Sequence, residues 1–258
     1  MMHRLRGASS ACMGWLAERG VPRPLRGLVY GGYCRITGAD ASEAELARSD
    51  YPSLGAFFVR RLKAGARVLG PDAAELASPC DGTIQARDRV EQGSLLQAKG
   101  QGYALSELLG GVAPVPAGSW AWTIYLSPRD YHRVHCPVDA RLSEVRWIPG
   151  LRYSVAPGVL ARTPRVLARN ERAVLVLDGP AGRLYLVMVG ALNVGRIRVV
   201  GVAPGTSPLG TPAFARGAEL ARFEMGSTVV LIAPGYEARP ELGPGASVRL
   251  FQPLARRP

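Results

Sequence analysis

The spacing of hydrophobic residues differs between the start and the remainder of the chain, and it predicts two kinds of structure. Over residues 1–72, short apolar stretches are interrupted by prolines and glycines, which predicts short helices. Over residues 73–258, apolar runs of strand length are separated by turn-forming residues. Residues 120–126 show the alternation most clearly. We therefore expect an α+β fold, in which N-terminal helices precede a mostly antiparallel β core that resembles a barrel or sandwich.

Capping and turn residues set the expected limits of individual elements. Asp40 precedes acidic residues and predicts a capped helix, while Ser53 is expected to cap a second, short helix. Asp178-Gly179-Pro180 predicts a hairpin, and residues 203–219 show no clear pattern and are expected to form a surface loop. The main expected strands lie at 95–100, 120–126, 173–177, 184–189, 228–232 and 248–254.

The composition fits one large domain, or a core with a smaller appendage, that contacts anionic groups. The 258 residues are 47% apolar and carry a net charge of +12, almost all of it from arginine. Guanidinium groups bind phosphate in a bidentate manner. Because the chain shows no nucleic-acid-binding module, a phospholipid surface is the expected partner and nucleic acid is not. No apolar run is long enough for a transmembrane helix, and four scattered cysteines suit a reducing compartment.

Residues 1–35 combine positive charge with apolar side chains. They contain six arginines and one glutamate, interleaved with residues such as Trp15, Leu16 and Leu28. This mixture is typical of a helix that lies in a lipid interface. A helical hairpin packed on the core would explain it equally well, because the glycines dilute any amphipathic pattern.

Two stretches contain candidate catalytic residues. Gly226-Ser227-Thr228 leads into an apolar strand, and a serine hydroxyl becomes a nucleophile when a base removes its proton. Taken alone, Gly-Ser before a strand is more often a simple turn. The second stretch follows strand 120–126 and contains His132 and His135. We expect no metal site, because zinc needs at least a third ligand and no further His or Cys pair has ligand spacing.

Several short motifs occur in an order that is typical of one family. They are Phe57-Phe58-Val59-Arg60, Ser78-Pro79-Cys80-Asp81-Gly82, Leu96-Gln97-Ala98-Lys99-Gly100, the run from Tyr125 to Pro137, Ala168-Arg169-Asn170-Glu171-Arg172, Val189-Gly190-Ala191 with Val194-Gly195, and Gly226-Ser227-Thr228. In this order they resemble the phosphatidylserine decarboxylase proenzymes in their bacterial membrane-associated form. The Tyr125–Pro137 run is long and specific, whereas Gly-Ser-Thr alone is weak.

The sequence departs from the family pattern at four positions. Met225 replaces a frequent Leu, Cys80 a usual Ala, Gln101 a frequent His, and Arg196 a usual Ser. None of these changes removes a reacting group. Gln101 and Arg196 leave the headgroup contacts open.

The resemblance implies a precursor that cuts itself between Gly226 and Ser227. Its base is His135, oriented by Asp81, which takes the proton from the Ser227 hydroxyl as in a serine-protease triad. The Ser227 oxygen attacks the carbonyl of Gly226 to form an ester. β-Elimination, hydration and loss of ammonia then leave a pyruvoyl group at residue 227.

The pyruvoyl group made from Ser227 is the implied cofactor. It forms a Schiff base with the amine of phosphatidylserine and acts as an electron sink while CO2 leaves, so that phosphatidylethanolamine is released. His132 is the candidate acid/base of this stage. The implied products of self-cleavage are a β chain, 1–226, and an α chain, 227–258, whose strands stay in the core.

The resemblance also implies where the protein works and with what partners. Residues 1–72 would associate with the membrane and residues 73–258 would form the catalytic domain. The enzyme would attach peripherally to the cytoplasmic face of the bacterial inner membrane, where phosphatidylserine lies. Pairs of β and α chains would associate as homodimers.

Two other functions remain open at this point. An ordinary serine hydrolase could use Asp81, His135 and Ser227 without cutting itself, although no Gly-x-Ser-x-Gly elbow surrounds the serine. A β-rich membrane-binding or carrier module would use both histidines only structurally. The hydrophobic part of the lipid substrate also stays open.

Overall fold

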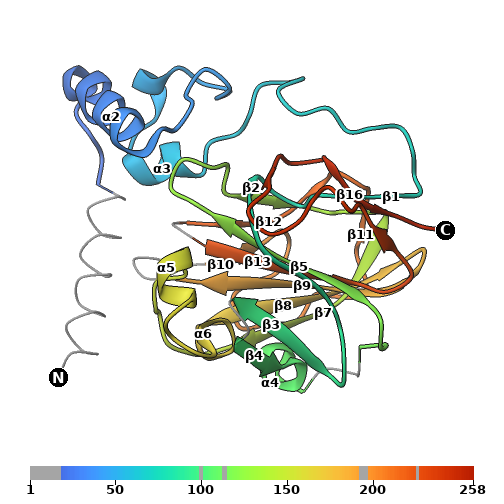
Figure 1. Cartoon of the computed structure of the whole chain (residues 1–258). Coiled ribbons are helices and arrows are strands. Elements are labelled where there is room, and N and C mark those ends of the chain that lie inside the picture. The colour runs from blue at the N-terminus through green and yellow to red at the C-terminus, as the bar shows by residue number, and fades with distance from the viewer. Residues whose placement is uncertain (1–18, 99–100, 112–114, 192–196, 225–226) are drawn as a thin grey trace.

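An eight-stranded antiparallel sheet forms the centre of the molecule (Figure 1). The structure is a computed structural model that describes residues 19–98, 101–111, 115–191, 197–224 and 227–258. In these ranges the protein is mostly antiparallel sheet with few helices, which confirms the predicted α+β class. The helices are α2 (Arg23–Thr37), η1 (Arg48–Asp50), α3 (Leu54–Phe58), α4 (Leu105–Leu109), α5 (Pro157–Leu160) and α6 (Val166–Arg169).

The strands belong to one large sheet and three small ones. They are β1 (Glu75–Ala77), β2 (Gly82–Arg89), β3 (Ser94–Ala98), β4 (Gln101–Ala104), β5 (Trp120–Leu126), β6 (Arg133–His135), β7 (Ala140–Ile148), β8 (Arg172–Gly179), β9 (Gly182–Gly190), β10 (Ile197–Val199), β11 (Ala213–Phe214), β12 (Glu219–Phe223), β13 (Ser227–Ala233), β14 (Glu237–Ala238), β15 (Ser247–Val248) and β16 (Pro253–Arg256). The large sheet has the order β11-β7-β8-β9-β13-β5-β2-β15, and the small sheets are β10-β12-β6, β1-β16-β14 and β3-β4. The large sheet ends at β11 and β15 and does not close, so the described strands form layers and not a barrel.

Strand β13 is buried on both faces because side chains along a strand alternate between the two sides. Val229, Leu231 and Ala233 pack into one core, while Val230 and Ile232 pack into a second core on the opposite face. All five side chains are fully buried.

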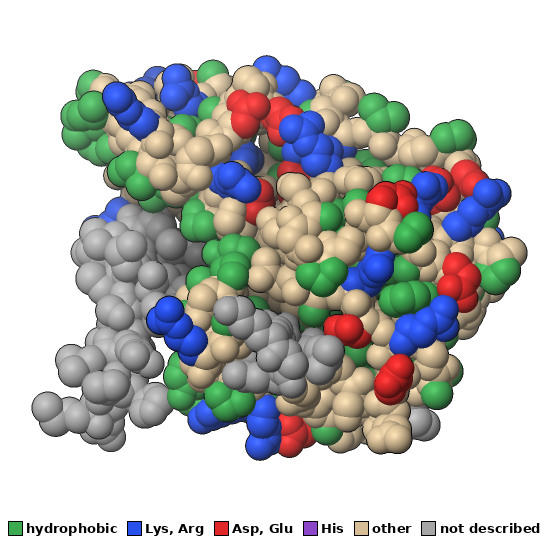
Figure 2. Space-filling model, viewed as in Figure 1, with side chains coloured by type: hydrophobic (Ala, Val, Ile, Leu, Met, Phe, Trp, Pro, Cys, Tyr) green, Lys and Arg blue, Asp and Glu red, His purple; other side chains and the backbone are tan. Residues whose placement is uncertain are grey.

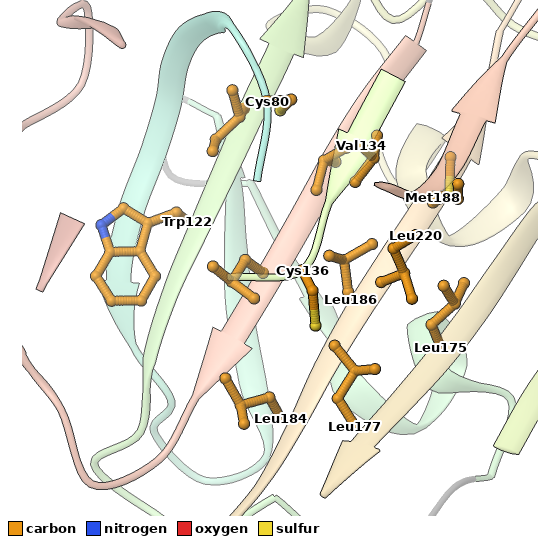
Figure 3. Close-up of a cluster of buried hydrophobic side chains, with 14 of the residues drawn as sticks. Cys80, Trp122, Val134, Cys136, Leu175, Leu177, Leu184, Leu186, Met188 and Leu220 are labelled. Carbon is orange, nitrogen blue, oxygen red and sulfur yellow. The ribbon is translucent and has the colours of Figure 1, made fainter. Parts of the chain in front are cut away.

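The small sheet β10-β12-β6 covers the first of these two cores. Figure 3 shows Val134, Cys136 and Leu220 close to Leu186 and Met188 of the large sheet. The residues on the Val229 side of β13 therefore face this covering layer.

The N-terminal helices form a separate aromatic cluster beside the sheets (Figure 1). Tyr30 of α2 stacks on Phe57 of α3 with ring centroids 5.6 Å apart, and Tyr51 meets the same ring edge-on at 5.3 Å. The Ser53 hydroxyl accepts a hydrogen bond from the Ala56 amide, so Ser53 caps α3 as predicted. Helix α2 ends at Gly38, whose φ of 78° suits the left-handed cap that glycine adopts easily.

Two sequence-based expectations about local structure are wrong. The stretch after Asp40 forms turns and not a helix, because the Asp40 carboxylate accepts a hydrogen bond from the Ser42 amide, a local bond that competes with helix formation. Residues 203–219 are not entirely a loop, since β11 lies within them and β12 begins at Glu219. β11 has two residues and pairs at an edge of the large sheet, and only the first residue of β12 lies in this stretch, which leaves a weak pattern in the sequence.

The double burial of β13 predicts a large cost for shortening one of its side chains. In Leu231→Ala the buried cavity should lower the free energy of unfolding by about 2–5 kcal/mol. The control Leu209→Ala removes a side chain that is 98% exposed and should change stability by less than about 0.5 kcal/mol. Urea unfolding of both variants tests this, and equal stabilities would contradict the described packing.

Candidate active site

Ser227 is the first residue of β13 and lies between two neighbouring strands. It pairs with Leu126 of β5 on one side and with Gly190 of β9 on the other. Its side chain is fully buried, and its hydroxyl has no hydrogen-bond partner among the described residues. An unpaired buried hydroxyl costs free energy and needs an explanation, and a catalytic role is one such explanation. Gly226, the other side of the predicted cleavage site, lies outside the described residues, as does Met225.

The side chain of Ser227 faces the layer that contains both histidines. Ser227 is two residues before Val229, so strand alternation places their side chains on the same side of the sheet. That side is covered by β6 and β12, and β6 contains His135. The predicted nucleophile and the histidine stretch therefore come from facing layers of the fold.

His132 lies just before β6 and is fully buried against the ring of Phe58, with centroids 3.9 Å apart. Its Nδ1 lies 2.9 Å from the Asp130 carbonyl oxygen, which can only accept, so Nδ1 carries the proton and donates it. Nε2 then has a free lone pair, and it has no partner among the described residues. Burial lowers the pKa of His132 from 6.5 to about 3, so the ring is neutral and able to accept a proton.

The loop before His132 is held by Asp130. The Asp130 carboxylate accepts hydrogen bonds from the Ser127 amide and hydroxyl, both at 2.7 Å. Burial raises the pKa of Asp130, and the Ser127 hydrogen bonds oppose that rise. Asp130 thus fixes the loop and, through its carbonyl, the tautomer of His132.

His135 has different surroundings. Its neighbour Val134 points into the core, so strand alternation directs His135 to the other side of β6. Its Nδ1 donates to the Gly217 carbonyl at 2.8 Å, and its Nε2 accepts from the Tyr131 hydroxyl at 3.0 Å. Burial lowers the pKa of His135 as well. The neutral ring therefore has its basic nitrogen directed at Tyr131.

Asp81 is paired with arginine in this structure. Arg67 donates to both carboxylate oxygens, at 3.0 and 2.5 Å, and the Leu250 amide donates at 2.6 Å. Arg67 also binds Glu43 with two hydrogen bonds of 2.9 Å. Among the described residues Asp81 and His135 share no hydrogen bond, so Asp81 does not orient that ring in this arrangement. The catalytic roles of Asp81 and His135 stay predictions.

Gly82, next to Asp81, explains how the carboxylate reaches this position. A Cβ at residue 82 would lie 2.5 Å from the Tyr125 carbonyl oxygen, closer than real Cβ atoms come. Only glycine therefore allows β2 to approach β5 this closely beside the Asp81 side chain. The Asp-Gly pair is a structural requirement as well as a turn signal.

Several residues that contribute to this region were not identified from the sequence. Asp130 and Tyr131 lie within the Tyr125–Pro137 motif, in which only the histidines are candidate catalytic residues by sequence. Arg67 lies in a stretch without a helix or strand pattern. Arg60 is 4% exposed, donates to the Arg129 carbonyl at 3.1 Å, and has two nitrogens without a partner in the described structure. The aromatic and basic residues of the Phe57–Arg60 motif could have suggested a contact with the histidine loop.

A cavity of about 620 Å³ lies at the same end of the large sheet as Ser227. We call it the Trp147 cavity; its lining includes Trp147, Glu171, Arg172, Ile197 and Arg198. Gly150 closes one wall, where a Cβ would lie 2.5 Å from the Arg169 carbonyl oxygen.

Backbone contacts place the Glu171 side of this cavity two strands across the sheet from Ser227, the predicted nucleophile. The Gly190 amide donates to the Glu171 carbonyl at 2.9 Å, and Gly190 is the cross-strand partner of Ser227. Neighbouring strands are about 4.8 Å apart, so Glu171 and Ser227 are separated by roughly 10 Å across the sheet.

The described residues contain no group of three or more His, Cys, Asp or Glu side chains arranged to hold a metal ion. Of the two departures that bear on headgroup contacts, Arg196 lies outside the described residues, and the side chain of Gln101 is not described.

Comparisons with known proteins agree with the resemblance in the motifs. The family model for phosphatidylserine decarboxylase matches residues 54–256. A phosphatidylserine decarboxylase proenzyme of Alkalilimnicola ehrlichii is 40% identical over 88% of this chain and 83% of its own length. Proenzymes of the same name from Nitrosococcus oceani and Halorhodospira halophila are 41% and 43% identical, over 90% and 91% of this chain and 82% and 85% of their own lengths.

The buried neutral state of His132 predicts a contribution to acid sensitivity. In the folded protein the pKa of His132 is lowered to about 3, so the ring stays unprotonated until the pH approaches that value. In the unfolded chain the ring has its ordinary pKa of 6.5 and takes up a proton near that pH. Stability should therefore fall as the pH drops below 6.5, by up to about 1.4 kcal/mol per pH unit from this group. Urea unfolding across this range should show a shallower loss in His132→Gln, and an unchanged slope would contradict the assignment.

Proposed function

Because the chain belongs to the phosphatidylserine decarboxylase family, we propose that it cuts itself between Gly226 and Ser227 and then decarboxylates phosphatidylserine to phosphatidylethanolamine. The observation that carries the proposal is the buried Ser227 hydroxyl, which has no partner among the described residues and faces the layer containing the histidine stretch. The relatives are named as proenzymes of a phosphatidylserine decarboxylase, which supports processing of a precursor.

Self-cleavage uses the atoms of the chain itself. The Ser227 oxygen attacks the Gly226 carbonyl carbon, and the peptide bond becomes an ester while the Ser227 nitrogen gains a proton. Loss of the Cα proton then expels the Gly226 carboxylate and leaves a carbon–carbon double bond at residue 227. Addition of water and release of ammonia yield a ketone, the pyruvoyl group.

The surroundings of residue 227 fit a small group of this kind. The position is fully buried, its only polar side-chain atom has no hydrogen bond among the described residues, and strand pairing on both sides holds the backbone. A pyruvoyl group supplies an electron-accepting carbonyl that draws electrons from the substrate as CO2 leaves. The protein's own contribution is to exclude water, hold the headgroup and move protons.

We assign the two histidines separate tasks, because their ring nitrogens meet different groups. His135, with Asp81, would take the proton of Ser227 during self-cleavage, which requires the His135 ring to leave Tyr131 and Gly217 and turn toward Ser227. His132, whose Nε2 is free among the described residues, would hold and return a proton at the substrate carbon.

The same free nitrogen also supports a second assignment, in which His132 serves the Ser227 hydroxyl directly. In that arrangement His135, bonded to Tyr131 and Gly217, would only stabilise the loop.

The chain 227–258 would remain in the fold after cleavage. Its first strand, β13, is hydrogen-bonded to β5 and β9, and β16 pairs with β1 and β14. The two products would therefore stay associated as a β chain and an α chain. We also propose, on the family resemblance, that such pairs form homodimers.

Helix α2 offers a surface for peripheral membrane attachment, which we propose for the cytoplasmic face of the bacterial inner membrane. Leu25, Leu28, Val29 and Ile36 are all exposed and recur at helical spacing on one side of α2. Figure 2 shows green and blue side chains together over this helix, where exposed Arg23 and Arg35 add positive charge.

This arrangement suits insertion of the apolar stripe among anionic headgroups. Residues 1–18, the rest of the predicted membrane region, lie outside the described residues. None of the described helices is long and apolar enough to span a membrane.

Self-cleavage is tested by the masses of purified variants. Wild-type protein should yield chains 1–226 and 227–258 with a ketone at residue 227, and Ser227→Ala should stay whole and inactive. Asp81→Ala and His135→Ala should stay largely uncut, since a positioned base is worth roughly 10²–10⁴-fold. His132→Ala should be cut but fail to release CO2 from phosphatidylserine.

The outcomes separate the alternatives. Ser143→Ala, which removes another partly buried hydroxyl, is the control and should mature normally. If His135→Ala is cut between residues 226 and 227 while His132→Ala stays uncut, His132 is the base. An intact wild-type chain that still hydrolyses esters would identify a serine hydrolase instead.

Membrane attachment is tested by replacing the apolar stripe of α2. The double variant Leu28→Ser/Ile36→Ser should lose most of its binding to phosphatidylglycerol vesicles, because each buried apolar side chain contributes about 1.5–3 kcal/mol. Leu209→Ser, at a residue 98% exposed on a different part of the chain, should bind as wild type does. Sedimentation with vesicles measures both, and equal binding of all three proteins would refute the role of α2.

A further inference from the structure

Arg60, just after α3, is a buried guanidinium without an anionic partner among the described residues. It is 4% exposed, and its Nη2 donates to the Arg129 carbonyl at 3.1 Å. Its Nε and Nη1 are shielded from solvent and have no partner in the part of the chain that the structure describes. The guanidinium lies 5.3 Å from the centre of the Phe57 ring, which attracts a cation but offers no oxygen to these N–H groups. A buried charge of this kind is costly unless an anion pairs with it.

Arg60 lies between α2 and the loop that precedes His132. On one side, Phe57 meets Tyr33 of α2 edge-on, with ring centroids 6.0 Å apart. On the other side, Phe58 packs against the His132 ring. Burial is the main cause of the lowered pKa of His132, and the Arg60 charge lowers it further. The guanidinium is therefore within electrostatic reach of the proposed proton carrier.

His132 in turn connects this arginine to Ser227. The Phe223 amide donates to the His132 carbonyl at 3.0 Å, which continues the pairing of β12 with β6 to this residue. His132 is two residues before Val134, so strand alternation directs both side chains to the core that Ser227 faces. The path from α2 to Ser227 thus passes Arg60 first and His132 second.

We propose that Arg60 binds the phosphodiester of the phosphatidylserine headgroup. The proposal rests on the function proposed above, which supplies this substrate. In the lipid, the phosphodiester lies between the acyl chains and the serine amine and carboxylate. That order matches the order in the fold, where the exposed apolar stripe of α2 comes first, then Arg60 and then His132. The N–H groups on Nε and Nη1 remain for phosphate oxygens.

The two nitrogens without a described partner are shielded from solvent, so a headgroup must displace a neighbouring side chain to reach them. Tyr33 is placed for this movement, because it is half-buried and contacts the same loop. Its hydroxyl donates to the Pro128 carbonyl, next to the Arg129 carbonyl that holds Arg60. Rotation of Tyr33 away from Pro128 would open the α2 side of the guanidinium.

The chemistry of decarboxylation favours the phosphodiester over the carboxylate as the partner of Arg60. The carboxylate loses its charge as CO2 leaves, so an arginine bound to it would stabilise the starting state and slow the reaction. The phosphodiester keeps its charge throughout. Contacts to it therefore lower the KM for the substrate and leave kcat nearly unchanged.

The kinetic test compares full-length Arg60→Gln and Arg60→Lys with wild type, using short-chain phosphatidylserine below its micelle concentration. Both replacements retain an N–H donor for the Arg129 carbonyl. Arg60→Gln should raise KM about tenfold or more, as expected for a lost hydrogen bond to a charged group, while kcat stays within about threefold. Arg60→Lys keeps the charge but not the planar fork, and should raise KM only about threefold.

Arg87→Gln is the matched control, because Arg87 has similar surroundings far from Ser227. Its guanidinium lies 5.5 Å from the centre of the Trp120 ring, donates to backbone carbonyls, and has an Nε without a described partner. Trp120 begins β5, whereas Leu126 at the other end of β5 is the partner of Ser227. This variant should leave KM and kcat unchanged.

Two kinetic results would overturn the proposal. A lower kcat with unchanged KM would show that Arg60 only positions the loop before His132. A change in KM that appears only on vesicles containing anionic lipid would assign Arg60 to the membrane surface and not to the substrate headgroup. Should Arg60→Gln fail to fold, Arg60→Lys decides alone, and an unchanged KM in that variant would contradict the phosphate site.

A binding test keeps this inference independent of self-cleavage. Glycerophosphoethanolamine contains the phosphodiester but no carboxylate, and calorimetry measures its binding to wild type and to uncut Ser227→Ala. Both proteins should bind it, Ser227→Ala/Arg60→Gln should bind it about tenfold more weakly, and ethanolamine should bind all of them equally weakly. Equal binding of glycerophosphoethanolamine with and without Arg60 would refute the phosphate site, whereas an uncut wild-type chain would refute only the proposed self-cleavage.

Discussion

The pairing of β13 with strands on both sides is the constraint on which the remainder of the site depends. Hydrogen bonding to β5 and β9 fixes the backbone of Ser227, and alternation along the strand then fixes the direction of its side chain. On a flexible loop, the backbone could reorient a serine so that its hydroxyl finds a hydrogen-bond partner. Here the strand removes that freedom, so the hydroxyl stays without a described partner and the chain beyond it stays attached on both sides.

The N-terminal helices contribute to the site as well as to the surface. Val59, just after α3, accepts a hydrogen bond from Arg133, while Phe58 packs against His132 and Arg60 holds the loop that precedes it. The hydroxyl of Tyr33 in α2 donates to the Pro128 carbonyl in the same loop. The helix that exposes an apolar stripe is thus connected through a few direct contacts to the proposed proton carrier, so the surface proposed for lipid binding and the proposed catalytic residue belong to one contiguous set of contacts.

The sequence predicted those features that depend on nearby residues. The β5 strand, the Ser53 cap and the hairpin at Asp178 follow from local alternation, capping and turn chemistry, and all three were correct. Long-range features were not predictable in this way. The ion pair between Arg67 and Asp81 joins an irregular segment to a turn that is distant in the sequence. In β7 (Ala140–Ile148), charged residues and a bulge near Ser143 break the alternation of apolar residues that would have predicted a strand.

The motif around His132 and His135 shows how local geometry can give two identical side chains different chemistry. An extended chain directs residues three apart to opposite sides, and β6 begins between these two histidines. One ring is then fixed by a carbonyl two residues before it in the chain and has a nitrogen without a partner among the described residues, while the other is fixed by Gly217 and accepts a hydrogen bond from the Tyr131 hydroxyl. Burial lowers the pKa of both rings, so the difference between them is one of position: Nε2 of His132 has no partner among the described residues, whereas Nε2 of His135 accepts a hydrogen bond from Tyr131. A short extended segment therefore gives two histidines different surroundings, which supports the separate roles proposed for them.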